Sequence, residues 1–80
     1  MARIVFLGRL ADLAGVLERE VAATPATGFN GLLALLDPPL VEALRDEKVR
    51  IAVNGVLTPR PALAFGPGDE VALLPPVSGG

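Results

Sequence analysis

The residues of this chain that could do chemistry are few. The sequence contains no cysteine, no histidine and no tyrosine, one lysine (Lys48) and one serine (Ser78). A nucleophilic site needs a nucleophile, a base and an orienting group, and soft or borderline metals are usually held by thiolate or imidazole. We therefore expect no self-contained nucleophilic centre and no metal site.

Carboxylates are the remaining reactive side chains, and paired carboxylates can do acid–base chemistry. Most of them occupy positions typical of turns or of solvent-facing strand and helix surfaces: Asp12, Glu18, Glu20, Asp37, Glu42 and Asp69. This pattern leaves acid–base catalysis formally open but does not favour it.

The last six residues, "PPVSGG", combine stiffness with small size. Pro75 and Pro76 favour an extended backbone, so the segment should leave the domain along a fixed direction. Two terminal glycines fit a channel too narrow for a side chain. The alternative is an ordinary frayed end, which is how most termini behave. We favour the first reading, in which the reactive group is the α-carboxylate of Gly80 and a partner enzyme activates it.

Alternating and helical patterns predict the elements that would hold this segment. Residues 2–8 and 71–74 are apolar on both faces, so we expect both to be strands that are buried on both faces, central in the sheet and placed side by side. Residues 16–22 carry Glu18 and Glu20 on one face and should lie near an edge. A further strand is expected at 49–53, followed by an Asn54-Gly55 turn and a short irregular strand.

Helical spacing predicts a short helix from residue 9 to a stop at Gly15. A second helix is expected over 29–36, with Thr27 as its cap, and helical turns resume at 40–44 after the Asp37-Pro38-Pro39 interruption. The fold class is therefore α+β, with a mixed four- to five-stranded sheet and helices packed on one face.

Composition limits the partners. Eighty residues, 51% of them hydrophobic, make one small domain. The net charge is −2 and the seven basic residues are scattered, which does not fit a nucleic-acid binder. No apolar run is long enough to span a membrane, and no signal peptide is recognisable. We expect a soluble, cytoplasmic protein without nucleic-acid or membrane partners.

The chain resembles the ubiquitin-like β-grasp sulfur carriers over essentially its full length. The residues that carry the resemblance are "IVFLGRLADLAG", "IAVNG" and above all "GDEVALLPPVSGG". The closest branch is the molybdopterin synthase small subunit (MoaD), because the helix after the first strand and the Pro-Pro before the tail are typical of it. The "VNGVLTPRPAL" segment mixes features of that branch and the thiamine branch (ThiS), so a thiamine-type carrier remains an alternative, as do tRNA thiolation and protein conjugation.

The resemblance implies a mechanism and partners. An E1-like adenylyltransferase would use ATP to adenylate the Gly80 carboxylate, and a sulfurtransferase would supply the sulfur of a thiocarboxylate. The tail, Pro76, Val77, Ser78, Gly79 and Gly80, would enter the large subunit of molybdopterin synthase and donate sulfur to precursor Z. The carrier would bind no cofactor, and the catalytic side chains would belong to the large subunit.

Two further expectations concern boundaries and contacts. Residues 1–77 would form the β-grasp domain and residues 78–80 a flexible Gly-Gly tail. In this family the partner docks on the sheet near the last strand, so exposed Phe65 and Leu74 are the expected interface residues.

Overall fold

Five strands form one mixed sheet in the computed structural model, which describes residues 1–76. The order across the sheet is β2-β1-β5-β3-β4; β1 and β5 run parallel, and the other neighbours are antiparallel. The strands are β1 (Ala2–Phe6), β2 (Glu18–Val21), β3 (Arg50–Val53), β4 (Val56–Leu57) and β5 (Glu70–Leu74). The first and last strands are thus central neighbours and β2 is an edge strand, as the sequence predicts.

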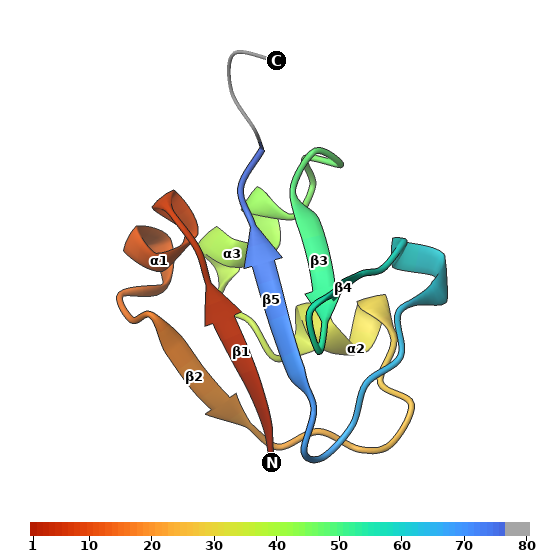
Figure 1. Cartoon of the computed structure of the whole chain (residues 1–80). Coiled ribbons are helices and arrows are strands. Elements are labelled where there is room, and N and C mark those ends of the chain that lie inside the picture. The colour runs from red at the N-terminus through yellow and green to blue at the C-terminus, as the bar shows by residue number, and fades with distance from the viewer. Residues whose placement is uncertain (77–80) are drawn as a thin grey trace.

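Three short α-helices pack on one side of this sheet (Figure 1). They are α1 (Arg9–Ala14), α2 (Phe29–Ala34) and α3 (Pro38–Ala43), and a 3-10 turn, η1 (Arg60–Ala62), follows β4. Gly15 ends α1 in a left-handed conformation with φ 76°, and Pro38 occupies the first turn of α3, where its missing N–H costs nothing. The expected α+β sheet with helices on one face is confirmed.

The core lies between the helices and the inward face of the sheet. Its inward residues alternate along the strands, because side chains of a strand point to opposite faces in turn. The largest fully buried side chains are Phe65, Ile4, Leu10, Leu32, Leu40, Leu44, Ile51, Leu73, Val49 and Val71. No buried polar or charged residue occurs among residues 1–76.

The expectation that β1 and β5 are buried on both faces is wrong. Ile4 and Phe6 are buried, but on the opposite face Arg3 and Leu7 are exposed and Val5 is half-buried. The helices cover one face only, so the second apolar face of the central strands meets solvent within the described chain.

The expected cap at Thr27 is also wrong. Gly28 is the N-cap of α2, without a side-chain hydrogen bond. The Thr27 hydroxyl donates instead to the carbonyl of Thr24 at 2.6 Å, and the Thr27 backbone is held in an isolated bridge to Phe65. A hydroxyl that bonds its own turn is not available to the helix.

None of the helices in residues 1–76 is long and apolar enough to cross a membrane.

Candidate functional site

The base of the tail is fixed where β5 leaves the sheet. Pro75 and Pro76 follow β5 and are half-buried. Gly8, at the end of β1, has φ +55°, and a Cβ built on it would lie 3.0 Å from Cγ of Pro75. Glycine is therefore favoured at this position for two reasons: L residues rarely adopt this backbone angle, and a side chain would crowd the ring of Pro75. The two central strands jointly set where the tail begins.

A hollow of about 420 Å³ lies beside this point. It is lined by Glu47 and Lys48 from the α3–β3 connection, Arg50 of β3 and Pro76. Two cations and one carboxylate therefore border the first residues of the tail.

Arg60 holds the α3–β3 connection in place. Its guanidinium donates hydrogen bonds to the backbone carbonyls of Leu44, Asp46 and Val49 and lies 4.8 Å from the ring centre of Phe29. A guanidinium has five donors in a fixed plane, so one side chain can serve several carbonyls at a helix end.

The uncovered face of the sheet carries a group of apolar side chains near the tail, with Arg50 of β3 beside Leu74. Register places Val5, Ala72, Ala52 and Leu57 side by side across four strands. Two residues further along β1 and β5, the same register brings Leu7 beside Leu74. Leu7 is 41% and Leu57 52% exposed, while Leu74 is half-buried. We call these six apolar residues the open-face patch.

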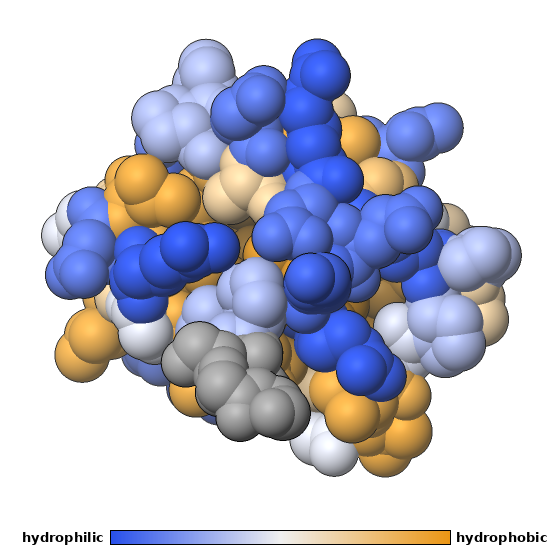
Figure 2. Space-filling model, turned by 90° about the horizontal axis from the view of Figure 1, so that it is seen from above, coloured by the Kyte–Doolittle hydropathy of each residue, from blue (hydrophilic) through white to orange (hydrophobic). Residues whose placement is uncertain are grey.

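Seen from the end at which β5 leaves the sheet, hydrophobic surface gathers on the α1 side and again on the β4 side (Figure 2). Hydrophilic surface separates these two areas, and the β4 side is the one that belongs to the uncovered face of the sheet.

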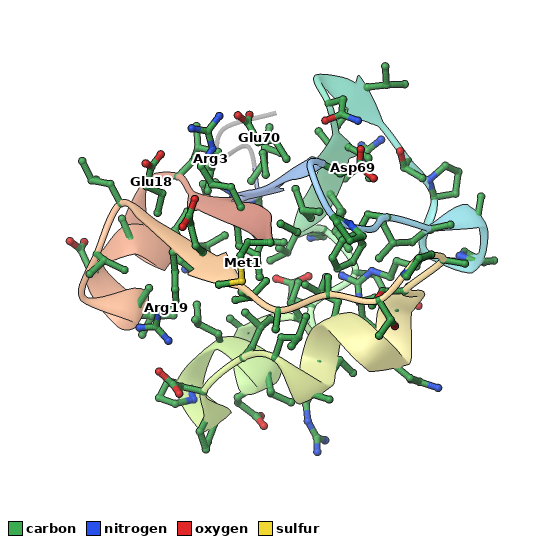
Figure 3. All side chains as sticks on the ribbon, turned by 90° about the horizontal axis from the view of Figure 1, so that it is seen from below. Met1, Arg3, Glu18, Arg19, Asp69 and Glu70 are labelled. Atoms are coloured by element: carbon green, nitrogen blue, oxygen red, sulfur yellow. The ribbon has the colours of Figure 1, made fainter. Side chains whose placement is uncertain are left out.

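The same face is charged at the end far from the tail. Arg3 of β1 lies between Glu20 of β2 and Glu70 of β5 in register, and its guanidinium is 2.6 Å from the Glu70 carboxylate. The hydrogen bond and charge of Glu70, with smaller effects of Glu18 and Glu20, raise the pKa of Arg3 above its ordinary value. Figure 3 shows Glu18, Arg3 and Glu70 on one side of the sheet. The face thus carries a network of charged residues far from the tail and mostly apolar residues, with Arg50, near it.

At that charged end, side-chain hydrogen bonds connect the turn after β3 with the turn before β5, and we call this group of bonds the Asn54–Asp69 clasp. The Asn54 amide donates to Asp69 at 3.0 Å, and the Asn54 carbonyl accepts from the N–H of Glu70 at 2.9 Å. The second Asp69 oxygen accepts from the N–H of Gly66 at 2.9 Å. The Asn54 bond, and then the Gly66 bond, lower the pKa of Asp69 below its usual 3.8.

No side-chain site for catalysis emerges from the part of the chain that the structure describes. No three His, Cys, Asp or Glu residues gather there in a way that could hold a metal ion. Glu70, at the start of β5, pairs with Arg3, and Asp69, directly before β5, accepts a hydrogen bond from Asn54, so both carboxylates are engaged in structural contacts. What residues 1–76 offer is a docking face and a fixed tail base.

The expected site residues fall in three groups. Pro76 lies at the tail base and Leu74 on the uncovered face. Val77, Ser78, Gly79 and Gly80 lie outside the described residues.

Phe65 was expected to be an exposed contact residue, and this is wrong, because its side chain is 2% exposed. Its N–H and carbonyl both pair with Thr27, at 3.0 and 2.8 Å, and this bridge draws the ring into the core. Phe65 is therefore not available to a partner in this conformation.

Leu7, Val5 and Leu57 were not recognised as surface residues. The sequence shows that both faces of these strands are apolar, and it also predicts helices on one face of the sheet only. The second apolar face must then be accessible.

Comparison with known proteins places the chain in a family. The model of the ThiS family matches residues 4–80. The chain belongs to the ThiS family. It is a ubiquitin-like sulfur carrier of the ThiS/MoaD type, as the tail and the sheet suggested.

Solved structures similar to this ThiS-family chain come from two functional groups. Molybdopterin converting factor subunit 1 of Pyrococcus furiosus is 26% identical, with a TM-score of 0.73, over 95% of this chain and 97% of that one. A complex of subunits 1 and 2 of the molybdopterin-converting factor from Helicobacter pylori contains a chain that is 25% identical, with a TM-score of 0.68, over 99% and 97%. Small archaeal modifier protein 1 (SAMP1) of Haloferax volcanii is 27% identical, with a TM-score of 0.70, over 99% and 98%.

Proposed function

We propose that this protein is the sulfur-carrying small subunit of a molybdopterin synthase. The observation that carries the proposal is the continuity between the Pro75–Pro76 tail base and the apolar open-face patch on a carrier fold. A partner that covers this patch would receive the tail at the same time. The resemblance to a subunit that is solved in complex with subunit 2 of the molybdopterin-converting factor supports a large-subunit partner.

The chemistry in this proposal belongs to Gly80 and to the partners. An E1-like adenylyltransferase joins the Gly80 carboxylate to AMP from ATP, with pyrophosphate as the leaving group. A persulfide of a sulfurtransferase then displaces AMP, and cleavage of its sulfur–sulfur bond by a reducing thiol leaves a thiocarboxylate. The thiocarboxylate sulfur is transferred to precursor Z in the large subunit, which supplies the catalytic side chains.

This chain contributes binding and direction. Gly8 and Pro75 fix the start of the tail, and the patch around Leu7 and Leu74 anchors the partner. Holding a reacting group in place converts an encounter between molecules into a step within one complex, which lowers the entropic part of the barrier. No cofactor bound to the carrier is required.

The proposal is tested by reconstitution. The protein is incubated with a molybdopterin-synthase activating enzyme, ATP and a sulfur donor, and its intact mass is measured before the large subunit and precursor Z are added. We expect the mass to rise by one oxygen-to-sulfur exchange at Gly80 and molybdopterin to form. A chain that lacks Gly79 and Gly80 should remain unmodified while keeping the same fold.

A second candidate is a ubiquitin-like modifier, favoured by the likeness to SAMP1 of H. volcanii. In that case the same terminus would form an isopeptide bond with lysines of other proteins, and covalent adducts would appear in extracts. A thiamine-type carrier would be loaded in the same way but would not support molybdopterin formation with the large subunit. The reconstitution therefore separates the molybdopterin-type carrier from the thiamine-type carrier, and the search for covalent adducts in extracts tests the modifier.

A further inference from the structure

The outer edge of β2 carries unpaired backbone groups. The N–H of Phe6 donates to the carbonyl of Leu17 at 2.9 Å, so the residues that exchange hydrogen bonds with β1 are Leu17, Arg19 and Val21. In an antiparallel pair the intervening residues turn their N–H and C=O outward. These are Glu18 and Glu20, and no hydrogen bond beyond the β1–β2 ladder reaches their backbone in residues 1–76. No element lies along the outer side of β2 in Figure 1.

This edge disfavours pairing with a second copy of itself. Partners across a sheet share a face, so the register that pairs both strands over their full length sets each glutamate opposite a glutamate of the copy, and a register shifted by two residues keeps one such pair. Charged side chains that oppose like charges are a known means of protecting an exposed edge from self-pairing. The two glutamates oppose pairing with an acidic strand, but they would favour pairing with a strand that carries basic residues.

The side chains of β2 indicate which residues a strand that pairs with this edge should carry. Glu18 and Glu20 stand on the open face, beside Arg3, whose guanidinium bonds Glu70. On the helix side, Arg19 is engaged by Asp37 at 3.2 Å. On the open face, an added strand would therefore lie next to the negative charges of Glu18 and Glu20.

The edge continues into a hollow that has both apolar residues and Asp12 in its lining. Val16 and Leu17, directly before β2, are 42% and 74% exposed, and with the end of α1 they line a hollow of about 340 Å³. An extended segment that pairs with β2 would bring its next residue to this hollow. An apolar side chain at that position would cover Leu17.

We propose that the β2 edge binds an extended segment of a partner protein that has basic residues at two alternating positions and an apolar residue at the end next to Leu17. The segment forms backbone hydrogen bonds with Glu18 and Glu20 and becomes a sixth strand, while its basic side chains pair with the two carboxylates. Since β1 separates β2 from β5, the segment can bind while the tail reacts. This inference does not depend on the proposed sulfur chemistry.

Amide spectra of the isotope-labelled full chain test the proposal. The probe is a short synthetic peptide with arginine at two alternating positions, threonine or valine between them and leucine at one end. We expect the amide signals of residues 17–21 to shift, and the N–H groups of Glu18 and Glu20 to gain protection from hydrogen exchange. Added salt should weaken binding, because exposed ion pairs are screened.

Reversing the charge of the two glutamates tests whether they select a basic peptide. The double variant Glu18→Lys/Glu20→Lys should bind the arginine peptide roughly tenfold more weakly and should prefer a matched glutamate peptide. The control, Glu42→Lys/Glu47→Lys, has the same net charge but changes α3 and the α3–β3 connection, and it should bind like the unaltered protein.

Three results would overturn the proposal. They are shifts that map away from β2, equal binding of both peptides by the unaltered protein, and an equal loss of binding in the control variant. Concentration-dependent dimerisation through β2, seen by size-exclusion chromatography, would identify a second copy as the occupant instead. Spectra of each variant without peptide establish that the fold is retained.

Discussion

The ring of Pro75 occupies the space that a side chain at Gly8 would need, since a Cβ at Gly8 would lie 3.0 Å from Cγ of Pro75. The end of β1 therefore defines where the tail leaves β5. The close approach of Gly8 and Pro75 thus connects the position of the tail, which the proposed chemistry uses, with the segment between β1 and α1.

Gly8→Ala should impair tail presentation beyond its effect on stability. The added methyl group meets Pro75 at a backbone angle that L residues rarely adopt, with φ +55°. We expect a loss of about 1 kcal/mol in unfolding free energy, and slower sulfur loading of Gly80 because the tail base is displaced. Urea unfolding and the rate of thiocarboxylate formation measure the two effects.

Gly15→Ala is the matched control. Its φ is +76°, but nothing lies within 4 Å of the added Cβ. It should lose similar stability and load sulfur at the normal rate. Equal loading rates for the two variants would contradict a role of the Gly8–Pro75 contact.

Leu7→Asp should weaken the large-subunit complex at least tenfold. Leu7 is 41% exposed and adjoins Leu74, so a carboxylate there would be buried without a partner when the open-face patch is covered. The change in unfolding free energy should be small, about 0.5 kcal/mol or less, because the side chain is already exposed. Calorimetric titration with the large subunit measures the affinity.

Leu13→Asp provides the comparison at equal exposure. Leu13 is 46% exposed and belongs to α1, which packs against α3 on the helix side of the sheet. Its binding should be unchanged. If both substitutions weaken the complex alike, the open-face patch is not the docking surface.

Arg60→Ala should destabilise the domain by about 2 kcal/mol, because three backbone carbonyls lose their donor and the Phe29 ring loses its cation. Arg60→Lys should recover only part of this, since an ammonium group cannot span all three carbonyls. Urea unfolding of both variants provides the measurement. Full recovery by lysine would show that charge alone matters.

The lowered pKa of Asp69 should make the free energy of unfolding decrease as the pH falls into the acid range. Its pKa is lowered in the folded protein by Asn54 and the Gly66 N–H, so the folded state holds the charged form more strongly than the unfolded chain does. The resulting stabilisation is present at pH values above the ordinary pKa of 3.8 and is lost as the pH falls through the lower, folded-state pKa.

Asp69→Asn tests this directly. The variant should be less stable than the unaltered protein at neutral pH, and the difference should shrink toward low pH. Thermal melts recorded across the acid range measure it. A difference that is independent of pH would contradict the assigned role of the Asp69 carboxylate.

The central strands could be predicted because they are apolar on both faces, and the Asn54-Gly55 turn because both residues tolerate positive φ, observed at 50° and 83°. The same pattern was misread as two-sided burial, since a sequence does not say whether a second apolar face meets a helix or a partner. The positions of Thr27 and Phe65 depend on a bridge between residues far apart in the chain, which no local pattern contains.

The side-chain contacts of the site were equally out of reach. Arg60 reaches carbonyls of residues 44–49, and Asn54 reaches Asp69, only because the sheet brings distant turns together. By contrast, the tail stands out in the sequence itself, since prolines, small residues and the absence of other reactive groups are all local or compositional signals.

The intact mass of the protein after incubation with the activating enzyme, ATP and a sulfur donor tests the central claim most directly. We expect the mass to increase by one oxygen-to-sulfur exchange, with fragmentation locating the change at Gly80. An unchanged mass, under conditions in which a known carrier is loaded by its own activating enzyme and the same sulfur donor, would contradict the assignment of Gly80 as the sulfur-bearing group.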